Sequence, residues 1–152
     1  MKPSKLVLLV EDNEMCAKFF RLILEEALCM KVHWVTDGAA ALDFLSTTRP
    51  DLIHMDIQLP RISGWDTIER IAARPELEGI PICVVTACGL FYRDRYDELR
   101  ERVAEAWSKP IDPADYVKMM LRQLFPEIFP GDSQVVALLR AWPSAGGRPA
   151  LH

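Results

Sequence analysis

The sequence predicts an α/β fold in which helices cover both faces of a doubly wound, five-stranded parallel sheet. Five short apolar runs are spaced along the chain, and a segment with helical periodicity follows each of them. Strands that alternate with helices of this length pair in parallel through right-handed crossovers. The first run shows no polar alternation, which indicates a strand covered on both faces. With 152 residues, the chain has the length of one domain.

The first three strand–helix units account for the N-terminal half of the chain. The expected strands are Leu6 to Val10, Val32 to Thr36 and Leu52 to Met55. Asp12 or Asn13 is expected to cap the first helix. The apolar stripe of that helix consists of Cys16, Phe19, Phe20, Ile23, Leu24 and Ala27. The second helix spans Ala39 to Leu45, and the third turns Trp65, Ile68, Ile71 and Ala72 inward.

The last two units follow a pair of prolines. Pro75 ends the third helix, and Pro81 precedes a fourth strand, Ile82 to Thr86. The charged helix that comes next carries apolar residues at helical spacing, namely Tyr92, Tyr96, Leu99 and Val103. A short fifth strand, Ala106 to Ser108, leads to Lys109-Pro110. The last helix begins at Asp112 or Pro113, and its apolar face consists of Val117, Met120, Leu121 and Leu124.

Composition excludes several classes of protein. The net charge of −4 gives no electrostatic basis for binding nucleic acid. No apolar run approaches the roughly 20 residues of a membrane span, and Met1-Lys2-Pro3 leads into a strand rather than a signal peptide. The four cysteines, which share no metal-ligand spacing, are interpreted as small buried thiols. We therefore expect a cytoplasmic protein that binds neither nucleic acid nor membrane.

Polar side chains stand at the carboxyl ends of four of the five strands. Glu11 and Asp12 follow the first strand, and Asp56 follows the third. Thr86 ends the fourth strand, and Lys109 follows the fifth. In open parallel sheets, ligands bind outside this edge, where the strand order reverses. We therefore expect the five groups to converge on one crevice.

The charges of these groups suggest a chemistry. Three carboxylates packed together repel one another unless a cation is present, and hard oxygen ligands suit Mg²⁺. Lys109 supplies a positive charge for an incoming anion, and the Thr86 hydroxyl can bond phosphoryl oxygens. Asp56 is then the expected nucleophile, which attacks phosphorus to give an aspartyl-phosphate. Pro60 and Gly64 mark the loop that follows it.

Four blocks of sequence resemble the motifs of the response-regulator receiver domain. They are Val10-Glu11-Asp12-Asn13, Met55-Asp56-Ile57-Gln58-Leu59-Pro60, Val85-Thr86-Ala87 and Ser108-Lys109-Pro110-Ile111. The similarity covers about residues 5 to 125 and is closest to stand-alone receivers of the chemotaxis and cell-cycle type. It implies a flavodoxin-like (βα)5 fold with strand order 2-1-3-4-5. The receiver domain would then occupy residues 1–125.

The resemblance also implies a mechanism. Asp56 would accept a phosphoryl group from a histidine kinase or a histidine phosphotransfer protein of a two-component system. Mg²⁺ would bind Asp12, Asp56 and the backbone carbonyl of Gln58, and Glu11 would act directly or through water.

The remaining family roles fall on the last two strand ends. Thr86, the backbone of Ala87 and Lys109 would contact the phosphoryl group, and the Lys109–Pro110 bond would be cis. A downstream protein partner would bind the face of the fourth helix, fifth strand and fifth helix.

The sequence departs from the family pattern at the conformational switch. Receivers usually carry an aromatic residue three positions before the lysine, and here that residue is Ala106, followed by Trp107. The segment from Thr86 to Lys109 is one residue longer than usual, and Arg61 replaces a frequent glycine. Thr86, Ala106 and Trp107 are the switch candidates. Trp107 should face away from Ala106. Either the chain shifts locally so that Trp107 takes over the switch, or the signal passes through backbone movement of the segment from Thr86 to Val103, and we expect the second.

Two other features need an interpretation. His54, two residues before Asp56, is interpreted as a hydrogen-bonded core histidine rather than a proton shuttle. Residues 126–152 are too few for an output domain. Within them, Ser133 to Trp142 is expected to form a short helix and Pro143 to His152 a disordered tail. This extension either packs on the domain or offers an apolar helix to a partner.

A site of this kind could serve four functions. A phosphoryl-accepting signalling module, not an enzyme, agrees best with the five strand-end groups. A degenerate receiver that acts as a scaffold or a phosphate sink is the alternative. An aspartate-dependent phosphatase needs a second acid two residues after its nucleophile, and that position is Gln58. A flavodoxin-like nucleotide binder needs a phosphate loop after the first strand, where the sequence places acids instead.

Overall fold

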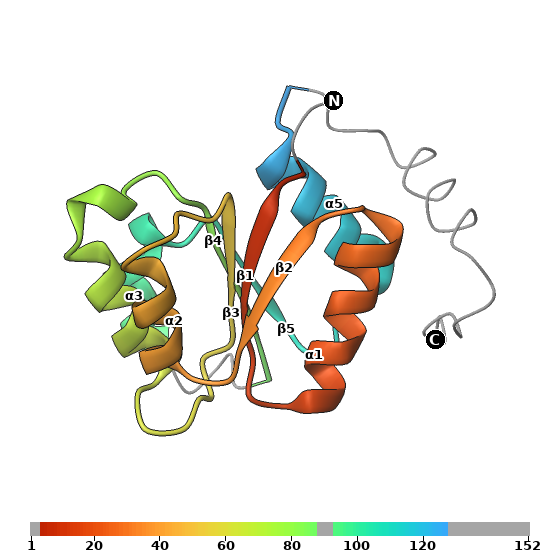
Figure 1. Cartoon of the computed structure of the whole chain (residues 1–152). Coiled ribbons are helices and arrows are strands. Elements are labelled where there is room, and N and C mark those ends of the chain that lie inside the picture. Colours follow the sequence, from red (N-terminus) through yellow and green to blue (C-terminus); the bar gives the residue numbers. More distant parts are fainter. Residues whose placement is uncertain (1–3, 88–92, 128–152) are drawn as a thin grey trace.

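The structure, a computed structural model, describes residues 4–87 and 93–127 (Figure 1). Five parallel strands form one sheet in the order β2-β1-β3-β4-β5, as the sequence predicted. The strands are β1 (Leu6–Val10), β2 (Lys31–Val35), β3 (Leu52–Met55), β4 (Ile82–Thr86) and β5 (Glu105–Ser108). Because β1 pairs with both β2 and β3, the order reverses there.

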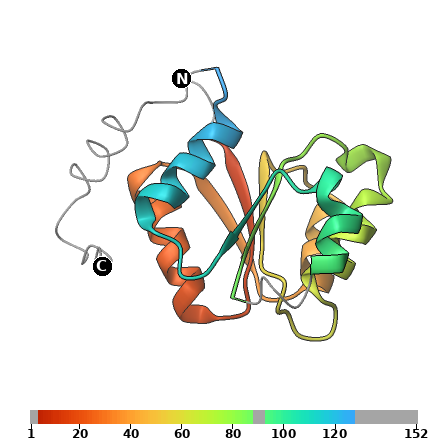
Figure 2. The same cartoon turned by 180° about the vertical axis from the view of Figure 1, so that it is seen from behind.

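Helices cover both faces of the sheet (Figures 1 and 2). One face carries α1 (Glu14–Arg21), its π-helical continuation η1 (Leu22–Ala27), and α5 (Pro113–Leu124). The other carries α2 (Gly38–Leu45), α3 (Gly64–Ala72) and α4 (Arg93–Leu99). Two short 3-10 segments, η2 (Pro75–Leu77) and η3 (Arg100–Arg102), lie before β4 and β5. The sheet is therefore doubly wound, with its carboxyl edge at the bottom of Figure 1.

Side-chain caps start four helices close to the carboxyl ends of strands, among them Ser63, whose hydroxyl accepts a hydrogen bond from Asp66 N at the start of α3. Asn13 caps α1, because its Oδ1 accepts a hydrogen bond from Cys16 N at 2.9 Å. Asp37 caps α2 in the same way, and Asp112 caps α5 ahead of Pro113. Each cap accepts a hydrogen bond from a backbone N–H of the first turn, which has no acceptor within the helix. Of the two first-helix caps that the sequence allowed, Asn13 is the one formed.

The core has two layers because alternate residues of each buried strand face opposite sides. In β1, Val7 and Leu9 pack with α1 and α5, whereas Leu8 and Val10 pack with α2 and α3. All four side chains are fully buried. This confirms the prediction, made from the unbroken apolar run, that the strand is covered on both faces.

Boundaries differ from the prediction at four places. α2 begins at Gly38 rather than Ala39, and β5 begins at Glu105 rather than Ala106. β2 begins and ends one residue earlier than expected, because Lys31 N already donates to Lys5 O. The α-helix after β4 ends at Leu99, and Val103 lies in extended backbone, since Ala104 N must reach Ile82 O to begin the sheet pairing of β5. Tyr92, the side chain of Tyr96 and the extension from residue 128 onward lie outside the described residues.

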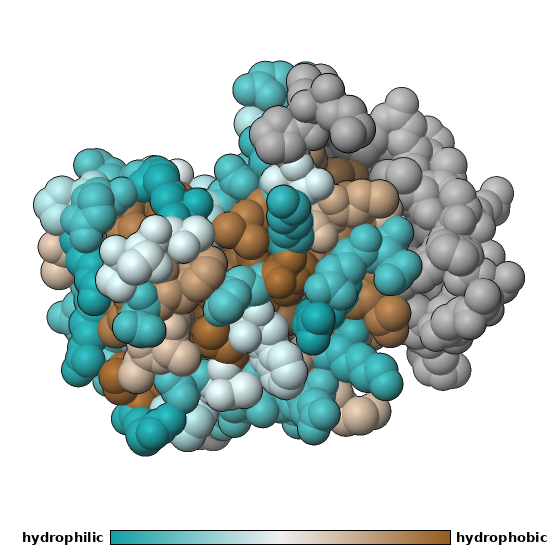
Figure 3. All heavy atoms as spheres, viewed as in Figure 1, coloured by the Kyte–Doolittle hydropathy of each residue, from teal (hydrophilic) through white to brown (hydrophobic). Residues whose placement is uncertain are grey.

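Hydrophilic residues cover most of the surface of the helical layers seen in Figure 3, and hydrophobic residues gather toward the middle. Within residues 4–87 and 93–127, no helix has the length and apolar character needed to cross a membrane.

Candidate functional site

Asp56 lies just beyond β3, at the carboxyl edge of the sheet. Its backbone N donates to Val10 O at 3.0 Å, which fixes it beside the end of β1. The side chain is nearly buried, with 4% of its surface exposed. One carboxylate oxygen accepts a hydrogen bond from Lys109 Nζ at 3.0 Å, and the other accepts one from Gln58 N at 3.3 Å. Asp56 is therefore held by groups from two loops.

Glu11 is fully buried beside it, and four contacts fix its position. Its backbone N donates to Val35 O at 3.1 Å, and its carbonyl accepts a hydrogen bond from the Trp34 indole at 2.8 Å. Its carboxylate accepts bonds from Asn13 N at 3.1 Å and from Lys109 Nζ at 2.6 Å. Sequence reasoning missed the contacts from Trp34 and Asn13. The sequence holds one hint of the Trp34 contact, because Trp34 stands near the end of the strand that pairs with β1.

Burial dominates the electrostatics of Glu11. It raises the pKa of Glu11 from 4.5 to about 7, although the hydrogen bond from Lys109 opposes the shift. Burial also acts to lower the pKa of Lys109, but the hydrogen bond to Glu11 and the charge of Asp56 outweigh it and raise that pKa. Lys109 is therefore charged at neutral pH and compensates two acids at once.

The carboxylates form one cluster. One oxygen from each of Glu11, Asp12 and Asp56 lies within 4.8 Å of the others. Asp12 is exposed, whereas the other two acids are buried, so the cluster opens to solvent on the Asp12 side. Three acids with one ammonium leave a negative site, and carboxylate oxygens are the ligands that Mg²⁺ prefers. This donor set fits a divalent cation.

The ends of β4 and β5 complete the crevice. Lys109 N donates to Thr86 O at 2.9 Å, which joins the two strand ends. Thr86 is buried, and Ala87 beside it is exposed. The Lys109–Pro110 peptide bond is cis, as predicted. Strand ends that lie far apart in the sequence therefore bring all five predicted side chains to one edge.

The loop after Asp56 requires a glycine at one position. A Cβ on Gly64 would lie 2.2 Å from the Asp56 carbonyl oxygen, so no other residue fits without moving the loop. Gly64 N also donates to Ile57 O at 2.9 Å. Arg61, where the family often has glycine, adopts a positive φ of 67° and pairs with Asp37 at 2.6 Å.

The switch candidates on β5 face opposite sides of the sheet. Ala106 is exposed. Trp107 is half-buried against the layer of α1 and α5, and its indole donates to Glu105 at 3.2 Å. Glu105 also accepts hydrogen bonds from Arg122 and Gln123 of α5. Trp107 is therefore tied to α5 rather than to the face that carries α4.

His54, two residues before Asp56 on β3, makes the core hydrogen bond that the sequence suggested. Its Nδ1 lies 2.8 Å from the Tyr116 hydroxyl, and both residues are fully buried. Phe20 packs on the imidazole with ring centroids 4.5 Å apart. Burial lowers the pKa of His54 to about 3, so the ring is neutral. The prediction of a core histidine is confirmed, while its partner Tyr116 was not foreseen.

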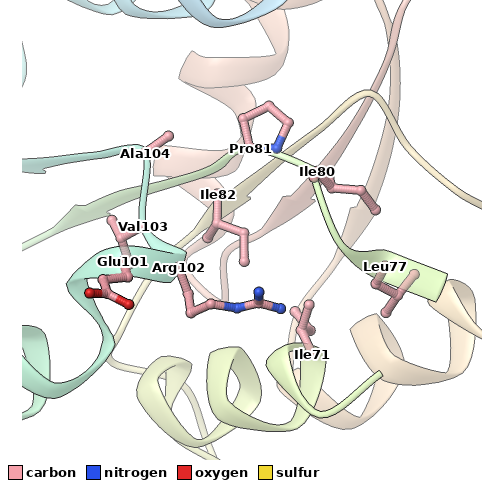
Figure 4. A pocket seen from close by; sticks show the side chains of 10 residues that line it. Ile71, Leu77, Ile80, Pro81, Ile82, Glu101, Arg102, Val103 and Ala104 are labelled. Carbon is pink, nitrogen blue, oxygen red and sulfur yellow. The ribbon is translucent and has the colours of Figure 1, made fainter. Parts of the chain in front are cut away.

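A hollow of about 180 Å³ lies at the opposite, amino edge of the sheet (Figure 4). Arg102 reaches across it toward Ile71, and its guanidinium donates to Ala72 O at 3.3 Å. Because the hollow lies far from the acidic cluster and is occupied by the Arg102 side chain, it takes no part in the site.

Comparison with known proteins agrees with this geometry. The model of the response regulator receiver domain matches residues 7–121. The polar-differentiation response regulator DivK of Brucella anthropi is 36% identical over 115 residues, which cover 75% of this chain and 91% of DivK.

Two solved structures extend the comparison. The receiver domain of a sensor histidine kinase from Pseudomonas aeruginosa PAO1, with magnesium coordinated in its active site cleft, is 29% identical with a TM-score of 0.71. The match covers 80% of this chain and 98% of that one. A CheY-like receiver domain from Methylobacillus flagellatus is 28% identical, with a TM-score of 0.68 and coverage of 80% and 99%.

Proposed function

The chain belongs to the response regulator receiver domain family, and from this premise we propose that Asp56 is its phosphoacceptor. The observation that carries the proposal is the Asp56 carboxylate, which is nearly buried, accepts a hydrogen bond from Lys109 at 3.0 Å and has oxygens of two further acids within 4.8 Å. A structural acid in that position would need only the lysine. The adjoining Glu11 and Asp12 instead make a cation site around a nucleophile.

The proposed reaction is phosphoryl transfer from a histidine of a kinase or a phosphotransfer protein. An Asp56 oxygen forms the new O–P bond while the N–P bond of the donor breaks, and the leaving imidazole nitrogen keeps the electron pair. Burial removes water from the Asp56 carboxylate, and the contacts from Lys109 and Gln58 N orient it. The Asp56 carboxylate is therefore held in position and is less hydrated than a carboxylate in water, which makes it a better nucleophile.

Mg²⁺ is the proposed cofactor. Asp12, Asp56 and Glu11 would hold it, with the backbone carbonyl of Gln58 as a further ligand, and the fit of this acidic cluster supports the assignment. The bound cation supplies positive charge next to the phosphoryl oxygens. The relative from Pseudomonas aeruginosa coordinates magnesium in its active site cleft, which supports the same proposal.

Lys109, Thr86 and Ala87 are the proposed phosphoryl contacts. Lys109 can move from the Asp56 oxygen to a phosphoryl oxygen without leaving the cluster, because it already bridges Glu11 and Asp56. The Thr86 hydroxyl and the Ala87 N–H, at the adjoining strand end, would donate to the remaining oxygens. All three groups then stabilise charge that develops on the phosphoryl group.

The proposal extends to the protein's role. Members of this family are signalling proteins, and we assign the chain no enzymatic activity of its own. A downstream partner would bind the α4–β5–α5 face, in the cytoplasm, with residues 1–125 as the receiver and 126–152 as an extension. A degenerate receiver without the usual switch is the second candidate, favoured by Ala106 where an aromatic residue is usual.

The test is intact mass after incubation with acetyl phosphate and Mg²⁺. We expect one phosphoryl group on the unmodified sequence and none on Asp56→Asn, a nearly isosteric change. Asp51→Asn, a matched acid at the other end of β3, should label normally. Equal labelling of Asp56→Asn would overturn the assignment, and omission of Mg²⁺ should abolish labelling of every variant.

A further inference from the structure

We propose that residues 133–142 of the C-terminal extension dock into an apolar hollow beside Lys109. The hollow, of about 490 Å³, lies between the first turns of α1 and the loop before α5. Its walls include Met15, Cys16, Phe19, Pro110 and Ile111, and Lys109 is the charged residue among the described ones that line it. Of the large apolar side chains in residues 4–87 and 93–127, the one that is exposed belongs to Met15, with 76% of its surface accessible. An apolar surface of this kind marks a binding site.

The loop of residues 88–92 is a poor occupant. It begins at Ala87 on the rim of the hollow but must lead within five residues to Arg93 at the start of α4. α4 lies on the opposite face, where Arg95 bonds Asp66 and Glu69 of α3 at 3.0 and 2.9 Å. The described chain therefore resumes, at Arg93, on the face of the sheet that does not carry α1.

The C-terminal extension has the right length and pattern. The described chain ends at Glu127, at the far end of α5 from the hollow, and α5 is about 18 Å long for its 12 residues. Residues 128–132 span up to about 17 Å when extended, and a ten-residue helix adds about 15 Å. A helix over residues 133–142 would place Val135, Leu138, Leu139 and Trp142 on one face. The segment can therefore lie along α1 and α5 and bring Trp142 to Met15.

A docked segment would lie against the site. Lys109 lines the hollow and also contacts Asp56, so the two regions share a wall. The docking itself does not depend on the identity of the phosphoacceptor, and its test needs no phosphorylation.

Thiol alkylation in the full chain tests the docking. Cys16 lines the hollow, while the exposed Cys29 lies beyond η1 and serves as an internal control. Rates at each thiol come from N-ethylmaleimide labelling, digestion and mass spectrometry. Leu138→Asp should speed alkylation of Cys16 by about tenfold or more, because a charge on the docking face favours the open state. Ala137→Asp puts the same charge on the opposite helix face and should change neither rate.

Three results would overturn the proposal: no change at Cys16 in Leu138→Asp, an equal acceleration in Ala137→Asp, or acceleration at Cys16 and Cys29 together, which indicates general loosening. Protection of Cys16 that rises with protein concentration would identify a second copy as the occupant and equally refute the proposal. A photo-crosslinking residue at position Met15 should attach to residues 133–142 of the same chain. Attachment elsewhere refutes it.

Discussion

At the scale of single residues, the His54–Tyr116 pair links the strand that carries Asp56 to α5. Because both groups are buried and bond at 2.8 Å, Tyr116→Phe should leave His54 Nδ1 unpaired. The expected loss is about 1–3 kcal/mol of unfolding free energy. In a His54→Leu background the same change should cost much less. Urea unfolding of the four variants measures this coupling, and an equal cost in both backgrounds would show that the bond contributes nothing.

Glu11 gives the metal-free protein a pH-dependent stability. Since burial raises its pKa from 4.5 to about 7, the folded state binds a proton that the unfolded state releases. The stabilisation is complete below pH 4.5 and is lost as the pH rises through about 7. The free energy of unfolding should fall by on the order of 2 kcal/mol across this pH window, and Glu11→Gln should abolish that fall. Urea unfolding in chelator measures it, and a decline of the same size in the variant would contradict the assignment.

At the scale of elements, the sequence predicts strands better than helix ends. Unbroken apolar runs locate β1, β3 and β4 to the residue, because both faces of these strands must be covered. The end of α4 was not predictable. Val103 keeps helical spacing in the sequence, yet the need to pair Ala104 with β4 pulls it into extended backbone. Tertiary pairing overrides local periodicity at that point.

The packing of Trp107 on β5 bears on how a signal would leave the site. Trp107 packs on the α1 and α5 layer and bonds Glu105, so moving it across the sheet would reverse the side-chain register of the strand. We expect phosphorylation to leave its emission maximum nearly unchanged. Fluorescence of a variant with Trp34, Trp65 and Trp142 replaced by Phe measures it. A strong shift, as for a ring passing between water and core, would mean that Trp107 is the switch.

At the scale of the whole molecule, topology makes the site predictable. Five strand-end groups must converge at the carboxyl edge of a parallel sheet, and Lys109 does reach Glu11 and Asp56. The sequence could not give the bonds that fix this geometry, because the Trp34–Glu11 and His54–Tyr116 contacts depend on how separate elements pack. The hollow beside Met15 was missed for the same reason, since α1 and the loop before α5 form it together.

Cation binding at the acidic cluster should stabilise the whole fold. Because three carboxylates repel one another, Asp12→Ala should raise the metal-free unfolding free energy. Mg²⁺ should stabilise the unmodified sequence by about 2.7 kcal/mol at one hundred times its dissociation constant and leave Asp12→Ala unaffected. Thermal unfolding with and without Mg²⁺ measures both effects. Asp43→Ala, an exposed acid on α2, is the control, and a normal Mg²⁺ response in Asp12→Ala would place the cation elsewhere.

The most direct test of the central claim locates the phosphoryl group chemically. Borohydride reduces an aspartyl-phosphate to homoserine, so the reduced protein, after digestion and sequencing by mass spectrometry, reveals which acid was modified. We predict homoserine at position 56 in samples treated with acetyl phosphate and Mg²⁺, and none in untreated samples. Homoserine at Glu11's neighbour Asp12 instead, or a borohydride-resistant phosphoryl group on another residue, would contradict the assignment of Asp56.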